Sequence, residues 1–327
     1  MKQFAFARKA IDHTRSSIAE LFDLRLSRVS PVIKKKEPLF HPVSNAGLNL
    51  NVMSFNIRRG NKRDGKNHWT YRRELVHEIL NQYRPDVLGL QEALDFQISE
   101  VSIMLPGYEK VGIGNRGGSK GLHNAIFFNA KRFQIAEEGT FWLSDTPDCP
   151  GSRGWGNIIP RICTWARLVE IKTQHSFYFY NTHLDHLSQR SREKSVIFLT
   201  HHIHARPVKV PFVLTGDFNA RERNTTIQYL KGKISLRSKL RAEILNPVPL
   251  MDAFRVRHPW KRNSATFNGF GRYVFRFKFD YIFVPSSAVV SEAMVINKRW
   301  KNCYPSDHFP VLTRIALPVL TKSHPSF

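Results

Sequence analysis

Apolar and polar positions follow two different periods along the chain, and together they predict a protein of mixed α/β type. Residues 50–57 alternate between apolar and polar, which is typical of a strand with one buried face. Residues 87–90 and 211–215 are short, mainly apolar runs, which predict buried strands. Residues 70–83 and 190–206 instead carry apolar positions at helical spacing, which predicts two amphipathic helices.

The strand predicted at residues 211–215 runs directly into Gly216-Asp217-Phe218-Asn219, and a buried strand does not need these polar residues. Asp217 and Asn219 are two positions apart, so their side chains point the same way if the strand geometry persists. A carboxylate beside a carboxamide suits the binding of a water molecule and a phosphate oxygen. The alternative is a polar turn in which Asp217 caps the next element.

Polar residues also follow two other predicted strands. Gln91-Glu92 comes directly after the run at 87–90, where a carboxylate is costly to bury unless it is paired or ligates a metal. The alternative is a glutamate that simply begins the next helix. His183 and His186 follow a strand predicted at 176–180, at a spacing too short to indicate zinc. For His186, a satisfied turn residue is an equally good interpretation.

Near the C-terminus, two aspartates and a histidine recur beside apolar runs. Asp280 lies in the apolar run 279–284, and Asp307-His308 comes just before the last predicted strand. A histidine next to a carboxylate can be held in one tautomer and kept ready to carry positive charge. This pattern therefore predicts an imidazole oriented by an acid.

Composition adds a strong charge imbalance to this picture. The chain has 327 residues and 24 Phe, enough for one large domain or two ordinary ones with a substantial core. Its 50 Lys and Arg exceed its 26 Asp and Glu, which gives a formal net charge of +24. Such a surplus favours an anionic partner: nucleic acid, another phosphorylated polyanion, or an anionic membrane surface. A generally basic, solvated surface is the alternative, and no obligate protein partner is implied.

The segment 231–278 concentrates this charge, with 12 Lys and Arg against two acids and with aromatic residues interleaved. Basic residues among aromatics suit contacts with a nucleic-acid backbone and stacking on its bases. The alternative is that the aromatics belong to the core and the basic residues form a solvated rim. We expect the aromatics to be mainly core and part of the charge to meet an anionic ligand.

Cysteine content and hydropathy indicate the cellular compartment in which the protein is expected. The three cysteines are odd in number and lack the spacing of a zinc site or a disulfide framework, which favours a reducing environment. No apolar run approaches the roughly 20 residues that span a bilayer, and residues 1–30 lack a secretory signal. We therefore expect a cytoplasmic protein, with secretion by a non-classical or specialised route as the alternative.

Three regions are predicted from these patterns. Residues 1–48 form a basic, partly helical extension, residues 49–318 form the folded domain, and residues 319–327 form a tail. Within the extension, residues 1–36 combine basic residues with apolar ones near helical spacing, a pattern suited to an anionic membrane surface. A helix packed on the domain, a frayed leader or an export signal are the alternatives.

Six short motifs, in order along roughly residues 48–318, resemble the endonuclease/exonuclease/phosphatase family, the metal-dependent phosphohydrolases related to DNase I. These motifs are Ser54-Phe55-Asn56, Gln91-Glu92, Asn181-Thr182-His183-Leu184, Gly216-Asp217-Phe218-Asn219, Asp280-Tyr281-Ile282 and Ser306-Asp307-His308. The segment 139–167 is similar to that of a bacterial branch whose substrate is generally unassigned. The resemblance implies a DNase I-like α+β fold, a four-layer sandwich of two mainly antiparallel sheets flanked by helices.

The resemblance also implies a metal centre. Glu92, helped by Asn56, would hold Mg²⁺ or Mn²⁺, and Asp307 would contribute to this metal or to a second one. Hard oxygen ligands without cysteine fit either ion.

The remaining roles that the resemblance implies concern the water and the phosphate. Asp217 would orient or deprotonate the attacking water, and Asn219 would fix the water and the phosphate. His183 and His308, the latter oriented by Asp280, would contact the scissile phosphate and neutralise its developing charge. Arg161 would add a phosphate contact.

One position departs from the family pattern. Relatives often carry Gly-Glu-x-x-x-Ile-Phe, whereas this chain has Gly121-Leu122-His123-Asn124-Ala125-Ile126-Phe127, so a carboxylate that supports His183 or contacts substrate is missing. The expected function is a metal-dependent nuclease or phosphodiesterase acting on nucleic acid by direct attack of an activated water. A phosphomonoesterase, including one acting on phosphoinositides or other lipid phosphates, is the alternative. A non-catalytic polyanion-binding protein is a second alternative.

Overall fold

The computed structural model describes residues 47–237, 242–262, 264–271, 277–299 and 303–319. Within these ranges, the strands and helices are as follows. The strands are β1 (Gly47–Asn56), β2 (Val87–Gln91), β3 (Tyr108–Val111), β4 (Ile126–Asn129), β5 (Phe133–Trp142), β6 (Ile162–Glu170), β7 (Ser176–His183), β8 (Phe212–Asp217), β9 (Leu236–Arg237), β10 (Glu243–Ile244), β11 (Leu250–Asp252), β12 (Asp280–Pro285), β13 (Val289–Val295) and β14 (Val311–Pro318). The helices are α2 (Trp69–Tyr83), α3 (Asp95–Met104), α4 (Gln189–Ala205), α5 (Thr225–Leu230) and α6 (Ala253–Arg257), with short 3-10 turns at Gly65–Asn67 and Gly269–Gly271.

The two helices predicted at 70–83 and 190–206 are present as α2 and α4, within one residue at each end. Most of the predicted extension 1–48, including the membrane-binding segment 1–36, lies outside the described residues, and so does the tail beyond Val319. The assignment of these regions stays a prediction. None of the described helices is long and apolar enough to cross a membrane.

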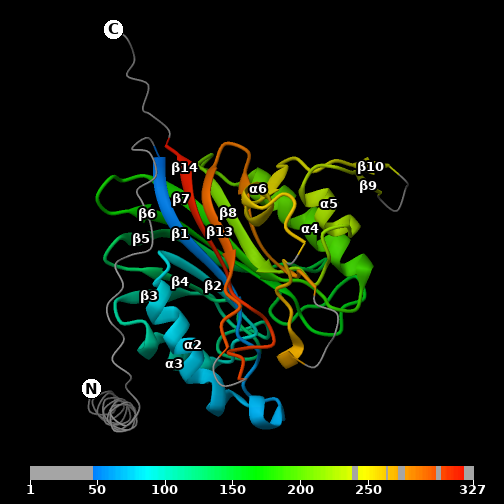
Figure 1. The fold of residues 1–327 in the computed structure, drawn as a ribbon. Helices are drawn as coiled ribbons and strands as arrows, with labels where there is room; N and C mark the ends of the chain where they lie inside the picture. Colours follow the sequence, from blue (N-terminus) through cyan, green and yellow to red (C-terminus); the bar gives the residue numbers. More distant parts are fainter. Residues whose placement is uncertain (1–46, 238–241, 263, 272–276, 300–302, 320–327) are drawn as a thin grey trace, which may run out of the picture. The chain divides into compact units, whose positions relative to one another are not determined.

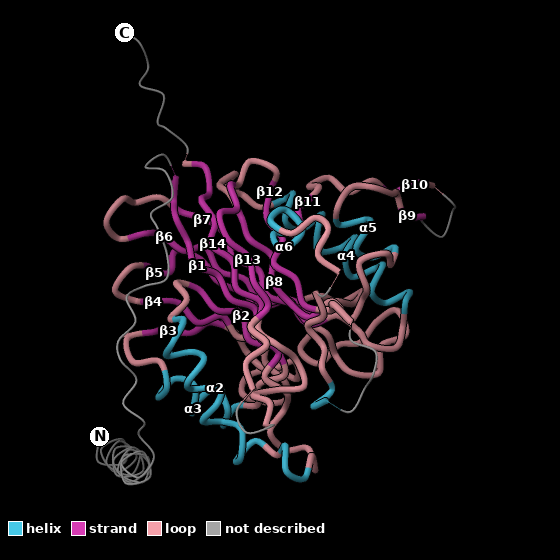
Figure 2. Tube along the Cα trace, in the orientation of Figure 1, coloured by secondary structure: helices cyan, strands magenta, loops and turns pink. Residues whose placement is uncertain are grey.

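Two six-stranded sheets form the core of the domain (Figures 1 and 2). The first has the order β13-β14-β1-β2-β4-β3 and the second the order β11-β12-β8-β7-β6-β5. Each sheet contains one parallel pair, β1–β2 or β7–β8, and all its other pairs are antiparallel. Apolar residues of both sheets, among them Val52, Phe128, Phe179 and Ile282, pack into one buried cluster between them.

Helices cover the outer faces of the sheets. Val196, Leu199 and Ile203 of α4 join Tyr180 and Leu214 of the second sheet in a separate apolar cluster. Helices α2 and α3 lie together against the first sheet (Figure 1). The four layers confirm the predicted α+β sandwich of two mainly antiparallel sheets flanked by helices.

The parallel pairs explain why the polar strand ends meet. In β1–β2, Asn56 is level with Gln91, and in β7–β8, His183 is level with Asp217. Parallel neighbours end at the same edge of a sheet, so each pair brings polar side chains together at its carboxyl end. The antiparallel strand β12 begins at this edge with Asp280, which pairs with Asp217.

A buried polar contact joins the two sheets just behind these strand ends. The Asn181 side chain of β7 donates hydrogen bonds to the carbonyls of Leu90 (2.8 Å) and Ala125 (3.0 Å) in the first sheet. Its oxygen accepts from Gln91 Nε2 at 2.7 Å. Gly89 lies opposite, where an added Cβ would be 2.5 Å from Thr215 Oγ1, so the close approach of the sheets requires glycine.

Candidate active site

The polar strand ends line one cleft of about 300 Å³. Its wall contains seven of the predicted site residues: Glu92, Arg161, His183, Asp217, Asn219, Asp307 and His308. The other two, Asn56 and Asp280, are fully buried and hydrogen-bond to Asp217 and His308. The structure thus brings together all nine residues that the sequence singled out, and their chemical roles stay predictions.

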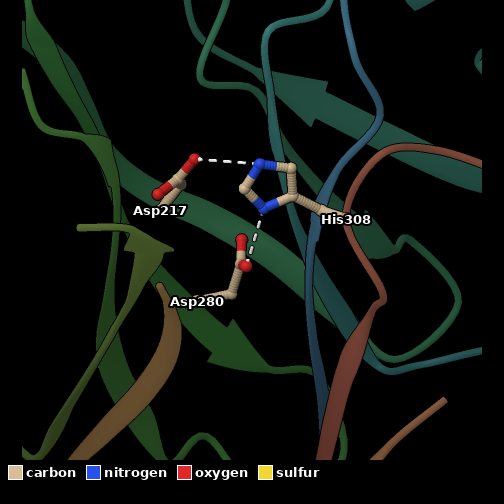
Figure 3. Close-up of side chains that lie close together, drawn as sticks. All are labelled: Asp217, Asp280 and His308. Carbon is tan, nitrogen blue, oxygen red and sulfur yellow. Dashed lines mark hydrogen bonds and ion pairs between the residues drawn. The ribbon is translucent and has the colours of Figure 1, made fainter. Parts of the chain in front are cut away.

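His308 lies between two carboxylates (Figure 3). Its Nδ1 is 2.8 Å from Asp280 Oδ2, and its Nε2 is 3.6 Å from Asp217 Oδ2. Burial disfavours the charged imidazole, but Asp280 and Asp217 outweigh this effect and raise the pKa of His308 to about 10. The ring is therefore a buried cation at neutral pH.

Asp217 is held by several donors at the end of β8. Its Oδ1 accepts the backbone N–H of Asn219 at 2.9 Å, and its Oδ2 accepts Asn56 Nδ2 at 3.0 Å. Burial raises the pKa of Asp217 above its usual value, although His183 and His308 oppose this. Gly216 precedes it because a Cβ there would lie 2.1 Å from the carbonyl oxygen of Thr182.

His183 differs from His308 in charge. Its Nε2 is 2.9 Å from Asn219 Nδ2, which donates to it, and 3.4 Å from Asp217 Oδ2. Burial lowers the pKa of His183 to about 4, because Asp217 only partly compensates for the lost hydration. One neutral and one cationic imidazole therefore flank the same aspartate.

Glu92 and Asp307 form an acidic side of the cleft. Glu92 has a left-handed backbone (φ 62°), and its Oε2 accepts the backbone N–H of Arg59 at 3.2 Å. Burial opposes its ionisation, but nearby positive charge, including that of Arg58, and the N–H of Arg59 lower the pKa of Glu92 below its usual value. Asp307 pairs with Arg58 at 3.2 Å, and burial raises the pKa of this aspartate.

These two carboxylates fit the donor set expected for Mg²⁺ or Mn²⁺. Asn56 donates Nδ2 toward Glu92 Oε1 (3.4 Å), while its oxygen accepts the backbone N–H of Arg58 (3.0 Å). In this arrangement the amide orients Glu92, and Arg58 supplies positive charge beside Asp307.

A second possible metal group is Asp217, Asp280 and His308, whose donor atoms lie within 4.8 Å of one another. The carboxylates, however, face opposite nitrogens of one ring, as Figure 3 shows. A cation at either nitrogen would replace the proton that joins the ring to its carboxylate. The geometry therefore suits a proton-sharing chain better than a metal site.

Arg161 occupies another wall and is almost fully buried. Its Nε is 3.4 Å from Asp185 Oδ2, and its Nη2 is 2.9 Å from His186 Nδ1. These two contacts hold the Arg161 guanidinium in the cleft lining, where a bound phosphate would need a positive charge. His186, for which the sequence left a structural role open, therefore also lines the cleft.

Arg72 is a supporting residue that the sequence did not reveal. It is only 1% exposed and donates to the carbonyls of Ile57, Arg58 (2.7 Å), Asn67 (3.0 Å) and Pro305 (2.9 Å). Its guanidinium also lies over the Trp69 ring, 5.0 Å from the centroid. It thereby joins the segment after Asn56 to the segment before Asp307.

Comparisons with known proteins agree with this architecture. The model of the endonuclease/exonuclease/phosphatase family matches residues 53–308. The mannosyl-6-phosphatase Bt3783 of Bacteroides thetaiotaomicron VPI-5482 is 30% identical, with a TM-score of 0.71 over 82% of this chain and 100% of that one. A family member from Bacteroides vulgatus is 27% identical, with a TM-score of 0.73 over 83% of this chain and 99% of that one. An uncharacterized protein, L388, of Acanthamoeba polyphaga mimivirus is 28% identical over 187 residues, 53% of this chain and 68% of its own length. The resemblance predicted from six motifs is confirmed, and the chain belongs to the endonuclease/exonuclease/phosphatase family.

Proposed function

We propose that this chain hydrolyses phosphodiesters of nucleic acid by direct attack of a water molecule. The observation that carries the proposal is the buried line of Asp280, His308 and Asp217, which opens into a cleft with basic side chains. Among the described residues that line the cleft, none is Ser, Thr or Cys. Water is therefore the nucleophile that this set of side chains supports best.

Asp217 is the group best suited to accept a proton from that water. Its oxygens are fixed by Asn56 and Asn219, and a raised pKa brings a carboxylate closer to the value that proton transfer near neutrality requires. Asn219 also donates to the neutral His183, which keeps that Nε2 an acceptor. The three side chains thus define an orientation for a water molecule.

Cationic groups of the chain would stabilise the negative charge that develops on phosphorus oxygens. His308 is positive because two acids flank it, and Arg161 is aimed at the cleft by Asp185 and His186. A Mg²⁺ or Mn²⁺ ion held by Glu92 and Asp307 would polarise the same oxygens. Arg58, Arg59 and Lys62 line one side of the cleft, where phosphates flanking the scissile one would meet positive charge.

A second candidate is hydrolysis of a sugar phosphate monoester. The observation that favours it is the 30% identity to a mannosyl-6-phosphatase whose whole length this chain matches. A cleft of about 300 Å³ also accommodates a phosphate with one small ring.

The test is a turnover panel with Mg²⁺ and with Mn²⁺ on plasmid DNA, single-stranded RNA, an inositol phospholipid and mannose 6-phosphate. Wild type is compared with Asp217→Asn and with Glu109→Gln, an exposed acid outside the cleft. We expect strand cleavage that Asp217→Asn abolishes and Glu109→Gln retains. Phosphate release without strand cleavage would replace the first candidate by the second. Tight, salt-sensitive binding of nucleic acid without any turnover would favour a polyanion-binding protein.

A further inference from the structure

The loop after α6, residues 258–262, exposes a tryptophan among cations. Trp260 is 90% exposed, more than any other large apolar side chain in the part of the chain that the structure describes. Arg257, Lys261 and Arg262 are exposed as well, and the segment 253–262 contains no acid. Trp260 is therefore an exception to the core position expected for most aromatics of the basic segment 231–278.

Arg255 holds this loop in a defined conformation. Its Nη1 donates to the carbonyls of His258 (3.0 Å) and Lys261 (2.8 Å), which lie on either side of Trp260 in the sequence. The same guanidinium forms a bidentate ion pair with Glu222, at 2.5 and 2.7 Å. Because these contacts fix the backbone on both sides of the indole, a ligand that covers the ring does not first have to order the loop.

The ion pair with Glu222 also places the loop near the cleft. Glu222 is three positions after Asn219, which lines the cleft, and three residues span at most about 11 Å. Arg221 and Arg223, on either side of Glu222, are exposed. A polyanion that leaves the cleft in this direction would therefore pass exposed cations before it reaches the loop.

The loop combines one apolar ring with positive charge on both sides. Within the described ranges, the guanidinium groups of Arg257 and Arg262 have no ion-pair or hydrogen-bond partner, so both can meet a ligand. Single-stranded nucleic acid fits this combination, because its unpaired bases stack on an indole while its phosphates contact arginine. A duplex keeps its base faces stacked on one another, and a membrane surface favours a broader apolar face than Trp260 with Val256.

We propose that Trp260, Arg257 and Arg262 form a contact site for single-stranded nucleic acid outside the cleft. The strand whose phosphodiester lies in the cleft continues past Arg221 and stacks one base on Trp260. This inference rests on the proposed function and deepens it, because it makes an unpaired strand, rather than a duplex, the preferred substrate.

Binding of oligonucleotides tests the stacking separately from turnover. Fluorescence anisotropy of a labelled 12-nucleotide thymidine strand is measured with Mg²⁺ and full-length Asp217→Asn protein, which prevents cleavage. Adding Trp260→Ala should weaken binding about 10-fold, but should change the affinity for a strand of abasic sites by less than about 2-fold. Adding Ile171→Ala, at an exposed position beyond the opposite end of β7 from His183, should leave both affinities unchanged.

The salt dependence tests the two arginines. Arg257→Ala combined with Arg262→Ala should reduce the slope of log affinity against log salt concentration by about 1.4, since each neutralised phosphate of a single strand contributes about 0.7. Lys131→Ala combined with Lys172→Ala, two exposed lysines in turns at the far end of the strands, should keep the slope of the parent protein.

Equal affinities of the parent and Trp260→Ala proteins for the thymidine strand, or an equal loss on the abasic strand, would overturn the inference. Binding to phosphatidylserine vesicles that depends on Trp260, without an effect on the oligonucleotide, would overturn it in favour of a membrane surface. Strand cleavage by the wild type with unchanged binding by Trp260→Ala would remove only this inference. Trp260-dependent binding without any turnover would keep the contact site and remove the hydrolytic function.

Discussion

Nδ1 of His308 lies 2.8 Å from Oδ2 of Asp280, and neither side chain is more than 6% exposed. Asp280, together with Asp217 on the other side of the ring, raises the pKa of His308 from 6.5 to about 10 in the folded protein. The folded state therefore holds a proton that the unfolded chain releases between these two values.

The first prediction concerns stability as a function of pH. Because the folded pKa of His308 is raised, its stabilising contribution is complete below pH 6.5 and is lost as the pH rises toward about 10. Asp280→Asn should remove most of this stabilising contribution. The melting temperatures of wild type and variant should therefore differ most at pH 6 and become equal near pH 10. A difference that stays constant across this range would contradict the pKa assigned to His308.

The same substitution should lower activity. Asp280→Asn removes the carboxylate that orients His308, and we expect the rate constant for hydrolysis to fall on the order of 10²- to 10⁴-fold. The measurement is kcat at saturating substrate, in a buffer where both proteins are folded. A variant with full kcat would show that His308 does not need Asp280 for the reaction.

Glu92 is predicted to act through the metal. Glu92→Gln keeps the side-chain shape and removes a charge that is present at neutral pH, since the pKa of Glu92 is lowered below its usual value. Titration of Mn²⁺ should show an affinity weakened 10-fold or more, and chelation should abolish wild-type activity until Mg²⁺ or Mn²⁺ is restored. Glu109→Gln should bind Mn²⁺ as the wild type does, and equal affinities of all three proteins would remove Glu92 from the metal site.

Arg72 is predicted to position both sides of the acidic wall. Arg72→Lys keeps the charge, but one amine cannot reach four carbonyls from separate segments, which leaves buried acceptors unpaired. We expect the free energy of unfolding to fall by about 2–4 kcal/mol, which lowers the melting temperature, and we expect the folded variant to bind Mn²⁺ more weakly. Arg63→Lys, an exposed change in the same region, serves as the control. Unchanged Mn²⁺ affinity in folded Arg72→Lys would limit Arg72 to a role in stability.

The contact between the sheets provides a prediction on packing. Gly89→Ala places a methyl group 2.5 Å from Thr215 Oγ1 and 2.7 Å from Asn181 Oδ1, and should destabilise the protein by about 1–3 kcal/mol. Combining it with Thr215→Ala should cost less than the two single changes added together, because the crowding is shared. Strict additivity in urea unfolding would show that the sheets relax apart at this point.

The sequence was most informative where polar residues followed apolar strands. Glu92, His183 and Asp217 could be identified because burying such groups has a cost that function must explain. The parallel register of β1–β2 and of β7–β8 brings these polar strand ends to the same edge of each sheet.

Other parts of the site gave no such signal. Arg72 lies in an amphipathic helix, where an arginine is expected to face solvent, and one of its partners is the carbonyl of Pro305, 233 positions away. Phe267 lines the cleft, whereas its sequence context predicts a core position, because a phenylalanine in a basic segment has the same pattern whether it faces a core or a cleft. Both roles depend on contacts between distant segments, which local periodicity does not encode.

The pairing of β1 with β14 has a consequence for the synthesis of the protein. Ser306 Oγ donates to the carbonyl of Asn56 at 2.7 Å across 250 positions, and His308 is two positions after this serine. A ribosome-bound chain that has not yet released β14 therefore lacks both the neighbour of β1 and the imidazole of the candidate site. The first sheet and the candidate active site can therefore be completed only after translation has passed this point.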